Sequence, residues 1–272
     1  MLKANYHTHT ELCGHAEGKV SDYVNEAIKA GFVELGLSDH AHTPEYFMSP
    51  DDYERNLLTR IMSDDDFENI YKPDVLKEKE NKNIKVLLGL ETEYVEEYHD
   101  HFEKLRKKLD YMIFGEHFFI HKGKVFCTYE DMDSDALEIY TDVAVKAMST
   151  GLYSIFAHPD LFMYSYNSIK GFRAFDDICR KCSERIIEAA IKNNVYLEVN
   201  ANGIQNTFNY YPEYTNYVYP REEFWEIVAK SDARIIIGAD AHTPSALDNE
   251  IVEKAIEFSD KMKLNRKDFL EI

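Results

Sequence analysis

Residues 234–242 read Arg-Ile-Ile-Ile-Gly-Ala-Asp-Ala-His, a β-branched run that ends in a carboxylate and an imidazole. A continuous apolar strand is typical of a parallel sheet whose two faces are both covered. In parallel barrels, active sites lie at the carboxyl ends of the strands. The stretch therefore predicts a buried strand over Arg234–Asp240 that presents Asp240 and His242 on a functional face.

Strand-like runs of this kind recur along the 272 residues and alternate with helical patterns. The other predicted strands are Lys3–His7, Val33–Asp39, Ile84–Glu91, Tyr111–Gly115, Tyr153–His158 and Val195–Asn200. The predicted helices are Ser21–Ala30, Asp51–Ile70, Glu96–Leu109, Asp135–Ser149, Phe175–Asn193, Arg221–Lys230 and Ala246–Phe258. Such alternation implies parallel strands joined by crossover connections. Most of the strands end in His, Asp or Glu, which favours a barrel over an open sheet, because a barrel gathers its strand ends on one face. No Pro/Gly/Ser-rich linker divides the chain, so we expect one α/β domain over residues 1–272.

The composition restricts the partners that the protein can have. Hydrophobic residues make up 44% of the chain and the mean hydropathy is −0.46, as in a soluble globular protein. The net charge of −19 argues against nucleic acid and anionic membranes, because both carry negative charge. The chain starts MLKANYHTHT, without the apolar core of a signal peptide, and its apolar runs are far shorter than the roughly 20 residues that span a bilayer. We therefore expect a cytoplasmic protein.

Potential metal ligands gather at the predicted strand ends. His7 and His9 are two residues apart, so their imidazoles point the same way on an extended strand. The later candidates are His15, His40, Glu91, His117, His158, Asp240 and His242. Imidazole and carboxylate groups that converge from several strands are what a site with several metal ions needs. A metal-dependent hydrolase is therefore the leading hypothesis.

These motifs, in this order, resemble the polymerase and histidinol phosphatase (PHP) superfamily from His7 to His242. Residues 12–18, Leu-Cys-Gly-His-Ala-Glu-Gly, resemble its stand-alone histidinol-phosphatase branch. The resemblance implies a distorted (β/α)7 TIM-like barrel, the PHP fold, and a centre of three divalent ions (Zn, Mn or Fe). It implies that His7, His9, Glu91 and Asp240 hold the first ion, that Glu91, His117 and His158 hold the second, and that His15, His40 and His242 hold the third. Glu93 is a rival for the bridging role of Glu91.

The resemblance also implies hydrolysis of a phosphate monoester. Two metal ions can hold a hydroxide and lower its pKa, and a third can offset charge on the phosphoryl group. We predict transfer to a metal-bridging hydroxide without a phosphoenzyme, with Glu91, Asp240 and His242 as the catalytic residues. Asp240, His242 or a metal-bound water would protonate the leaving group. The predicted substrate is L-histidinol phosphate, in histidine biosynthesis, and the protein is expected to be a monomer or homodimer with no nucleic-acid or membrane partner.

Other readings remain open from the sequence alone. The enzyme could act on nucleotides or on phosphotyrosine, or the chain could be a non-catalytic PHP-fold binding module, although no ligand position is lost. A metal-dependent amidohydrolase is a further alternative, but such barrels usually carry a metal-bridging Lys at a strand end, and no predicted strand ends in Lys.

The remaining candidates are residues that could bind substrate or orient the ligands. Relatives often carry a basic residue shortly after the sixth strand, where this chain has Gln205 and Asn206. The substrate-binding candidates are therefore Asn200, Asn202 and Arg173, with Lys170 or the ions as further sources of positive charge. Asp39 and Asp160 neighbour predicted ligands and could orient their imidazoles. The Tyr- and Pro-rich segment Tyr210–Pro220 is interpreted as a loop that forms a pocket wall, a lid or a packed surface.

Some residues that bear metal-binding chemistry lack a supporting motif. His42, His99, His101 and His121 are interpreted as surface histidines. Cys179 and Cys182 lie within a helical pattern and are assigned to packing, whereas Cys13 stays open as a thiolate ligand. Four cysteines in a chain of this length do not suggest a disulfide scaffold.

Overall fold

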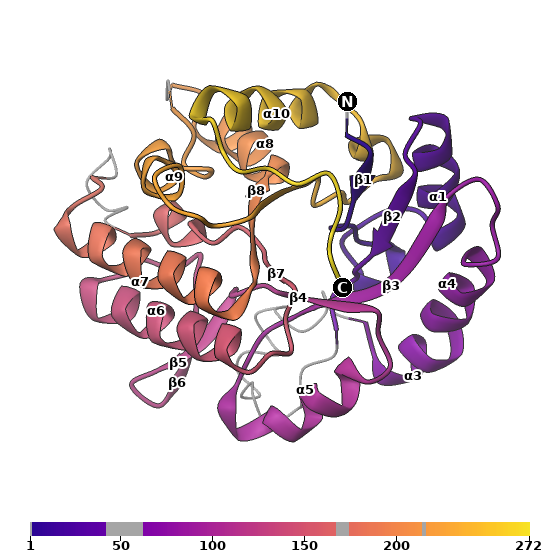
Figure 1. Ribbon diagram of the computed structural model, residues 1–272. Helices are drawn as coiled ribbons and strands as arrows, with labels where there is room; N and C mark the ends of the chain where they lie inside the picture. The colour runs from indigo at the N-terminus through magenta and orange to yellow at the C-terminus, as the bar shows by residue number, and fades with distance from the viewer. Residues whose placement is uncertain (1, 42–61, 167–173, 214–215) are drawn as a thin grey trace.

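Seven parallel strands form the central sheet of the computed structural model, which describes residues 2–41, 62–166, 174–213 and 216–272. The strands lie in the order β1 (Ala4–Asn5), β2 (Glu34–Leu37), β3 (Lys85–Thr92), β4 (Tyr111–Phe114), β7 (Ile155–Phe156), β8 (Tyr196–Asn200) and β9 (Ile235–Gly238). Figure 1 shows the strands in a ring. The prediction of seven parallel strands in a barrel is confirmed.

The edges β1 and β9 meet only at their carboxyl ends. Thr8 forms an isolated parallel bridge with Ala241, whose backbone N–H donates to the carbonyl of His7. At the opposite end of the barrel, the C-terminal segment lies where hydrogen bonds between β1 and β9 would otherwise close the sheet. The backbone N–H of Leu270 donates to the hydroxyl of Tyr6 at 3.0 Å. The barrel is therefore nearly closed, and the segment that completes it crosses the ring in Figure 1.

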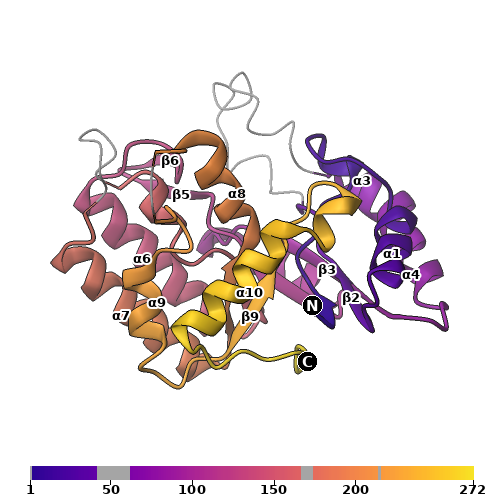
Figure 2. The same ribbon diagram turned by 90° about the horizontal axis from the view of Figure 1, so that it is seen from above.

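Helices surround the strands, as Figure 2 shows from a second direction. The α-helices among the described residues are α1 (Val20–Lys29), α3 (Asp64–Asp66), α4 (Lys72–Glu78), α5 (His99–Arg106), α6 (Ser134–Ser149), α7 (Asp177–Asn193), α8 (Ala201–Tyr210), α9 (Glu222–Val228) and α10 (Glu250–Met262). The π-helical turn η4 (Phe67–Tyr71) joins α3 to α4, and 3-10 turns occur at η1 (Glu11–Cys13), η5 (Glu96–Tyr98), η6 (Leu161–Tyr164) and η8 (Pro244–Leu247). None of the helices in the described ranges combines the length and apolarity that a membrane span requires.

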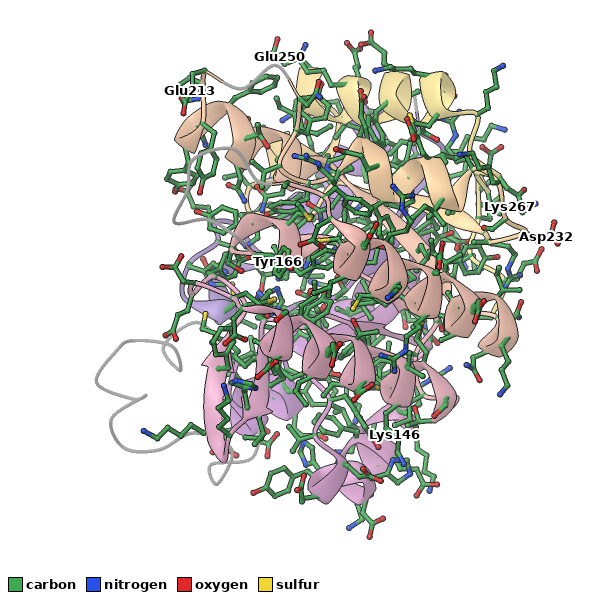
Figure 3. The ribbon with its side chains drawn as sticks, turned by 90° about the vertical axis from the view of Figure 1, so that its left-hand side faces the viewer. Lys146, Tyr166, Glu213, Asp232, Glu250 and Lys267 are labelled. Carbon is green, nitrogen blue, oxygen red and sulfur yellow. The ribbon has the colours of Figure 1, made fainter. Side chains whose placement is uncertain are left out.

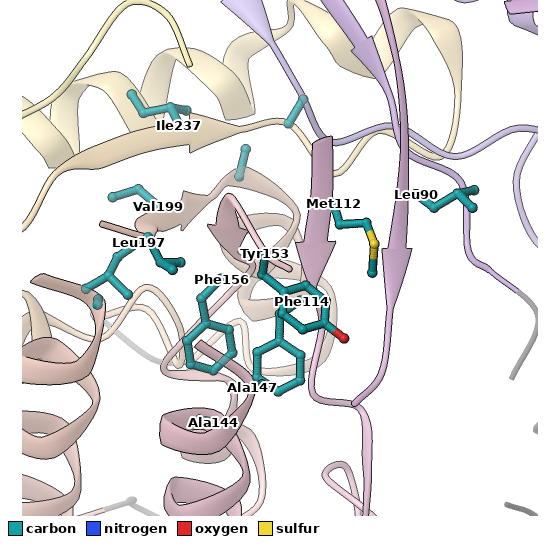
Figure 4. Packing of buried hydrophobic residues seen from close by; sticks show 14 of the residues in the cluster. Leu90, Met112, Phe114, Ala144, Ala147, Tyr153, Phe156, Leu197, Val199 and Ile237 are labelled. Carbon is teal, nitrogen blue, oxygen red and sulfur yellow. The ribbon is translucent and has the colours of Figure 1, made fainter. Parts of the chain in front are cut away.

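The core has two parts, one on each face of the curved sheet. Between the sheet and the helices, Phe114 and Phe156 pack against each other with ring centroids 4.8 Å apart, and Leu197 belongs to the same buried cluster (Figure 4). Inside the barrel, the hydroxyl of Tyr111 donates to the carbonyl of Tyr6 at 2.6 Å. Both faces of the strands are thus buried, as their continuous apolar runs predict. Charged side chains such as Lys146, Asp232 and Glu250 lie on the outside of the molecule (Figure 3).

The structure contains two elements that the sequence analysis did not predict. The first is the antiparallel hairpin of β5 (Phe118–His121) and β6 (Lys124–Cys127). Lys122 and Gly123 both have positive φ, which is the geometry of a tight two-residue hairpin turn. The second is α8, whose Asn-rich sequence favours turns. There the burial of apolar side chains and the cap by Asn200 outweigh local preference.

Several predicted helices differ in their bounds. The predicted helix Ala246–Phe258 is observed as α10, which begins at Glu250 after the 3-10 turn η8 and ends at Met262. Residues 51–61 of the predicted helix Asp51–Ile70 lie outside the described residues. The described part begins at α3 and continues through η4 and α4 to Glu78, beyond the predicted end.

Candidate metal centre

The barrel brings all the predicted ligand side chains together at the carboxyl ends of its strands. His7 and His9 follow β1, His15 follows η1, His40 follows β2, Glu91 lies in β3, His117 follows β4, His158 follows β7, and Asp240 and His242 follow β9. Several short loops thus deliver imidazoles and carboxylates from opposite sides of the ring to one place. The sequence prediction of convergence holds for this whole set.

Glu91 lies at the centre of the cluster, and its two oxygens face different histidines. Its Oε2 atom lies 3.2 Å from both His7 Nε2 and His40 Nδ1. Its Oε1 atom lies 3.2 Å from His158 Nε2 and 3.7 Å from His117 Nε2. A carboxylate in this position can give one oxygen to each of two ions.

Asp240 completes the group that contains the two histidines of the first strand. Its Oδ1 atom lies 3.0 Å from His9 Nε2 and 3.5 Å from His7 Nε2. Asp240 has a φ of +48° and His158 a φ of +33°, in a region that residues other than glycine rarely adopt. Such backbone strain is concentrated at functional sites, because surrounding structure must hold it in place.

A third group of imidazoles lies beside the first. His15 Nε2 and His242 Nε2 are 3.1 Å apart, and the ring of His15 stacks on that of His40 with centroids 5.3 Å apart. His9 also joins this group, because its ligand atom lies within 4.8 Å of those of His40 and His242. The arrangement brings together the side chains predicted for the third ion, with His9 shared between the groups.

The spacing of these atoms fits metal ligation. Two imidazole nitrogens about 2.0–2.1 Å from one tetrahedral ion lie about 3.3 Å from each other. The contacts of 3.0–3.5 Å in the cluster have that spacing. The Nε2 atoms of His7 and His9 are buried and form no well-aligned hydrogen bond among the described residues. Nitrogens that approach carboxylates in this way are compatible with lone pairs directed at a shared cation.

The buried carboxylates and imidazoles change one another's pKa. Burial disfavours the charged form of Glu91, but the surrounding histidines, first His7, hold its pKa well below the usual range. Burial also opposes a charge on His9 and His117, yet neighbouring carboxylates raise the pKa of each to about 9. Burial, with positive charge on His9, lowers the pKa of His242 to about 4. Metal ions would therefore compete with protons on His9 and His117.

Two further carboxylates orient the imidazoles from behind. Glu198 accepts from His7 Nδ1 at 2.8 Å, and Glu93 accepts from His117 Nδ1 at 2.8 Å. Carboxylates in this position fix which ring nitrogen keeps its proton. Asp39 Oδ1 lies 3.7 Å from His9 Nδ1 without a hydrogen bond, so its orienting role stays a prediction. Glu93 faces the far nitrogen of His117 rather than the centre of the cluster, which leaves Glu91 in the bridging position.

Glu198 was given no role by the sequence analysis. Besides His7, it accepts from the backbone N–H of His158 at 3.1 Å and from Asn200 Nδ2 at 2.8 Å. A Cβ atom at Gly238 would lie 1.7 Å from Glu198 Oε1, so the neighbouring strand needs glycine there. A carboxylate inside the apolar run Val195–Val199 is the signal that could have identified it.

The structure gives other contacts to two predicted site residues. Asp160 does not orient His158: its Oδ2 atom accepts from the indole N–H of Trp225 at 3.1 Å and from the backbone N–H of Arg221 at 2.5 Å. It therefore anchors the segment that precedes α9, and the prediction was wrong. Asn200 is buried and caps α8 by accepting from the backbone N–H of Gly203 at 2.8 Å, so its side chain is not directed at a substrate.

The other predicted residues divide between the site and the rest of the fold. Asn202 lines the cavity beside the cluster and donates to Asp240 Oδ2 at 3.2 Å. Arg173, Lys170 and His42 lie outside the described residues. His99 and His101 belong to α5, and His121 belongs to β5. Cys179 and Cys182 are buried on α7, as the assignment to packing requires.

Cys13 and the Tyr-rich segment were left open by the sequence. The thiol of Cys13 donates to the carbonyl of Thr10 at 3.2 Å, and burial raises its pKa to about 12. Its sulfur lies within 4.8 Å of ligand atoms of His9 and Asp39, so a thiolate ligand stays an alternative. Tyr210 ends α8 and lines the cavity, whereas Val218 and Tyr219 are buried. The described residues of segment 210–220 are therefore partly cavity wall and partly packed against the fold.

The cluster opens into a cavity of about 480 Å³. One side is formed by the predicted ligands His15, His40, Glu91, His117, Asp240 and His242, with Glu93 behind them. The other side is formed by Phe118, Cys127, Tyr129, Tyr164, Asn202, Asn206 and Tyr210. A small molecule can therefore reach the ligand atoms and also contact α8 and the aromatic side chains.

A sequence profile of the PHP domain matches residues 5–202, and the chain belongs to the PHP domain family. The histidinol-phosphatase of Bacillus subtilis (strain 168) is 21% identical over 271 residues, which cover 89% of this chain and 94% of that protein. The fold is similar to the crystal structure of histidinol phosphate phosphatase from Lactococcus lactis subsp. lactis, complexed with zinc, L-histidinol and phosphate. The TM-score is 0.70 at 18% identity, over 97% of this chain and 95% of that one. The matched profile ends at Asn202, and α8 to β9 complete the barrel beyond it.

Proposed function

We propose that the protein is a metal-dependent phosphatase that hydrolyses L-histidinol phosphate to L-histidinol and phosphate. The position of Glu91, with one oxygen toward each of two groups of histidines, is the observation that carries the hydrolytic part of this proposal. The substrate is supported by two relatives that cover nearly the whole chain, one named histidinol-phosphatase and one solved with L-histidinol and phosphate.

The proposed centre holds three divalent ions, of which zinc is supported by the solved relative and manganese and iron by the chemistry of the ligands. The ions would be held by His7, His9, Glu91 and Asp240, by Glu91, His117 and His158, and by His15, His40 and His242. When bound, such ions supply an activated water at neutral pH and offset the charge of the phosphoryl group.

The protein's own groups act by holding protons and orientations. Glu198 and Glu93 keep protons on the Nδ1 atoms of His7 and His117, so the Nε2 lone pairs stay available to metal ions. Asn202 donates to Asp240 Oδ2 and fixes the second oxygen of that carboxylate. Asp240 lies at the cavity wall as a carboxylate, where it could take a proton from the attacking water and pass it to the oxygen of the leaving group.

The proposal is tested by the substrate preference of the purified protein. Protein stripped of metal is reloaded separately with Zn, Mn or Fe and given L-histidinol phosphate, a nucleoside monophosphate or phosphotyrosine. We expect a specificity constant for L-histidinol phosphate at least about a hundredfold above those of the other esters. Equal or reversed preference would refute the substrate assignment, whereas absence of hydrolysis with every ester and metal would refute the phosphatase assignment.

The matched control for this test is Glu91→Gln, which removes the charge between the two groups of histidines. We expect it to abolish hydrolysis of every ester alike. A variant that retained activity would show that the phosphatase activity comes from another site or from a contaminant.

A further inference from the structure

The cavity has a side that the metal-ligand residues do not form. Asn202 and Asn206 are four residues apart on α8, so they lie on one face of the helix, and both line the cavity. Tyr129 and Tyr164 line it as well, from the segments that follow β6 and β7. These four residues are called the amide–tyrosine wall.

The tyrosines of the wall are held by other rings. Tyr129 lies parallel to the imidazole of His117, with centroids 6.4 Å apart and an interplanar angle of 13°. Tyr164 meets Tyr129 edge to face at 5.1 Å, and it packs in the same way against Tyr211 at 5.8 Å. Tyr129 remains 43% exposed. The wall thus begins beside the imidazole of His117. It presents aromatic surface to the part of a bound molecule that extends away from that imidazole.

Each amide of the wall has one of its two N–H groups in a hydrogen bond. Asn202 Nδ2 donates to Asp240 Oδ2, and a carboxylate can only accept, so the orientation of this amide is fixed. Asn206 Nδ2 donates to the hydroxyl of Tyr219 at 2.9 Å. In the part of the chain that the structure describes, neither side-chain oxygen accepts a hydrogen bond. The wall therefore offers acceptors to a bound group.

The chemistry of the wall favours a cation. Among the described lining residues there is no lysine or arginine, and Glu93 contributes a carboxylate that is not a proposed metal ligand. The faces of tyrosine rings attract cations within about 6 Å, and more strongly when water is excluded. An anionic group would find no basic side chain among the four residues of the wall.

We propose that the amide–tyrosine wall binds the leaving-group end of the substrate and selects a flat cationic group that donates N–H hydrogen bonds. The inference rests on the proposed function, in which the phosphoryl group lies at the metal-ligand histidines and the alcohol extends away from them. In L-histidinol, the ammonium and the imidazole supply the charge, the flat ring and the donors.

The test uses the binding of L-histidinol itself, measured by calorimetry on the full-length, metal-loaded protein and on the metal-stripped protein. Asn206→Leu removes an acceptor of the wall, and Asn206→Asp keeps acceptor oxygens in the same place. Asn209→Leu makes the same change on the exposed side of α8, where Asn209 contacts Gln205 and does not line the cavity. The ratio of specificity constants for L-histidinol phosphate over O-phosphoethanolamine, which lacks the ring, is measured in parallel.

We expect Asn206→Leu to weaken L-histidinol binding about tenfold and to lower the substrate ratio to a similar extent, the effect of one lost hydrogen bond to a charged group. Asn206→Asp should bind at least as tightly as the wild type, and Asn209→Leu should match the wild type in both measurements. Equal effects of Asn206→Leu and Asn209→Leu, or a tenfold loss in Asn206→Asp, would overturn the inference. If L-histidinol binding depends on Asn206 but L-histidinol phosphate is not hydrolysed, the wall stands and the proposed function fails.

Discussion

Replacing Glu198 by glutamine tests how His7 is kept in a metal-binding tautomer. Glu198 Oε2 accepts two hydrogen bonds, from the backbone N–H of His158 and from Asn200 Nδ2, and Oε1 accepts one from His7 Nδ1. A glutamine keeps the first two bonds only if its single oxygen takes the Oε2 position. Its NH₂ group then faces His7 Nδ1, which must accept instead of donate.

The substitution also changes Nε2, the other nitrogen of the His7 ring. With Nδ1 as an acceptor, the proton of a neutral His7 moves to Nε2, the atom 3.2 Å from Glu91 Oε2 in the cluster. A protonated Nε2 has no lone pair for a metal ion. Loss of a carboxylate behind a ligand histidine typically costs 10- to 100-fold in metal affinity, or about 1.4–2.7 kcal/mol. We expect Glu198→Gln to weaken zinc binding by this factor while the barrel stays folded.

The assay is competition for zinc between the stripped protein and a chelator, with circular dichroism to check folding. Glu34→Gln is the matched control, because Glu34 is a buried strand carboxylate that accepts from the hydroxyl of Tyr6 at 2.6 Å, away from the cluster. It should bind zinc like the wild type even if its stability falls. Zinc affinity of Glu198→Gln within about twofold of the wild type would refute the tautomer argument.

Three further predictions concern protons, packing and support of the site. Because the pKa values of His9 and His117 are raised to about 9, both imidazoles are protonated at pH 7.5 in stripped protein. Zinc binding should therefore release protons and tighten as the pH rises from 6.5 to 9. Calorimetry in buffers of different ionisation enthalpy measures the proton release, and binding without it would contradict the prediction. A Cβ atom at Gly115 would lie 2.2 Å from Glu91 Oε1, so Gly115→Ala should displace that carboxylate. The change should lower the free energy of unfolding by about 1–3 kcal/mol and weaken zinc binding. Thermal denaturation with and without zinc measures both effects. Tyr71 is fully buried and its hydroxyl bonds two backbone groups beside the cluster, so Tyr71→Phe should lower the free energy of unfolding by about 1–2 kcal/mol in urea titration, and an unchanged midpoint would contradict this.

The strands and the order of the barrel could be predicted because burial on both faces leaves a simple sequence pattern. Apolar β-branched runs such as Ile235–Ile237 are typical of strands that are covered on both faces. The elements that were missed depend on interactions that the pattern does not contain. α8 forms because Asn200 caps it and Ile204 is buried, although its Asn-rich sequence favours turns.

In the candidate site, too, some residues could be identified from sequence motifs, whereas others could be identified only from the fold. His7 and His9 could be paired from their spacing alone, because side chains two apart on a strand share a face. Glu198 could not, because its partners come from the segments after β1 and β7. Asp160 follows His158 by two residues, but the chain turns there and directs its carboxylate to Trp225. The sequence motifs thus predicted which side chains cluster, but they did not predict the residues that support them.

The most direct test of the account is phosphate release from L-histidinol phosphate as a function of the number of zinc ions bound per chain, counted by mass spectrometry on the same samples. The account predicts no release from stripped protein, and activity that rises with metal content to a maximum at three ions per chain. Release that survives complete removal of metal, or a fully loaded protein that leaves L-histidinol phosphate intact, would contradict it.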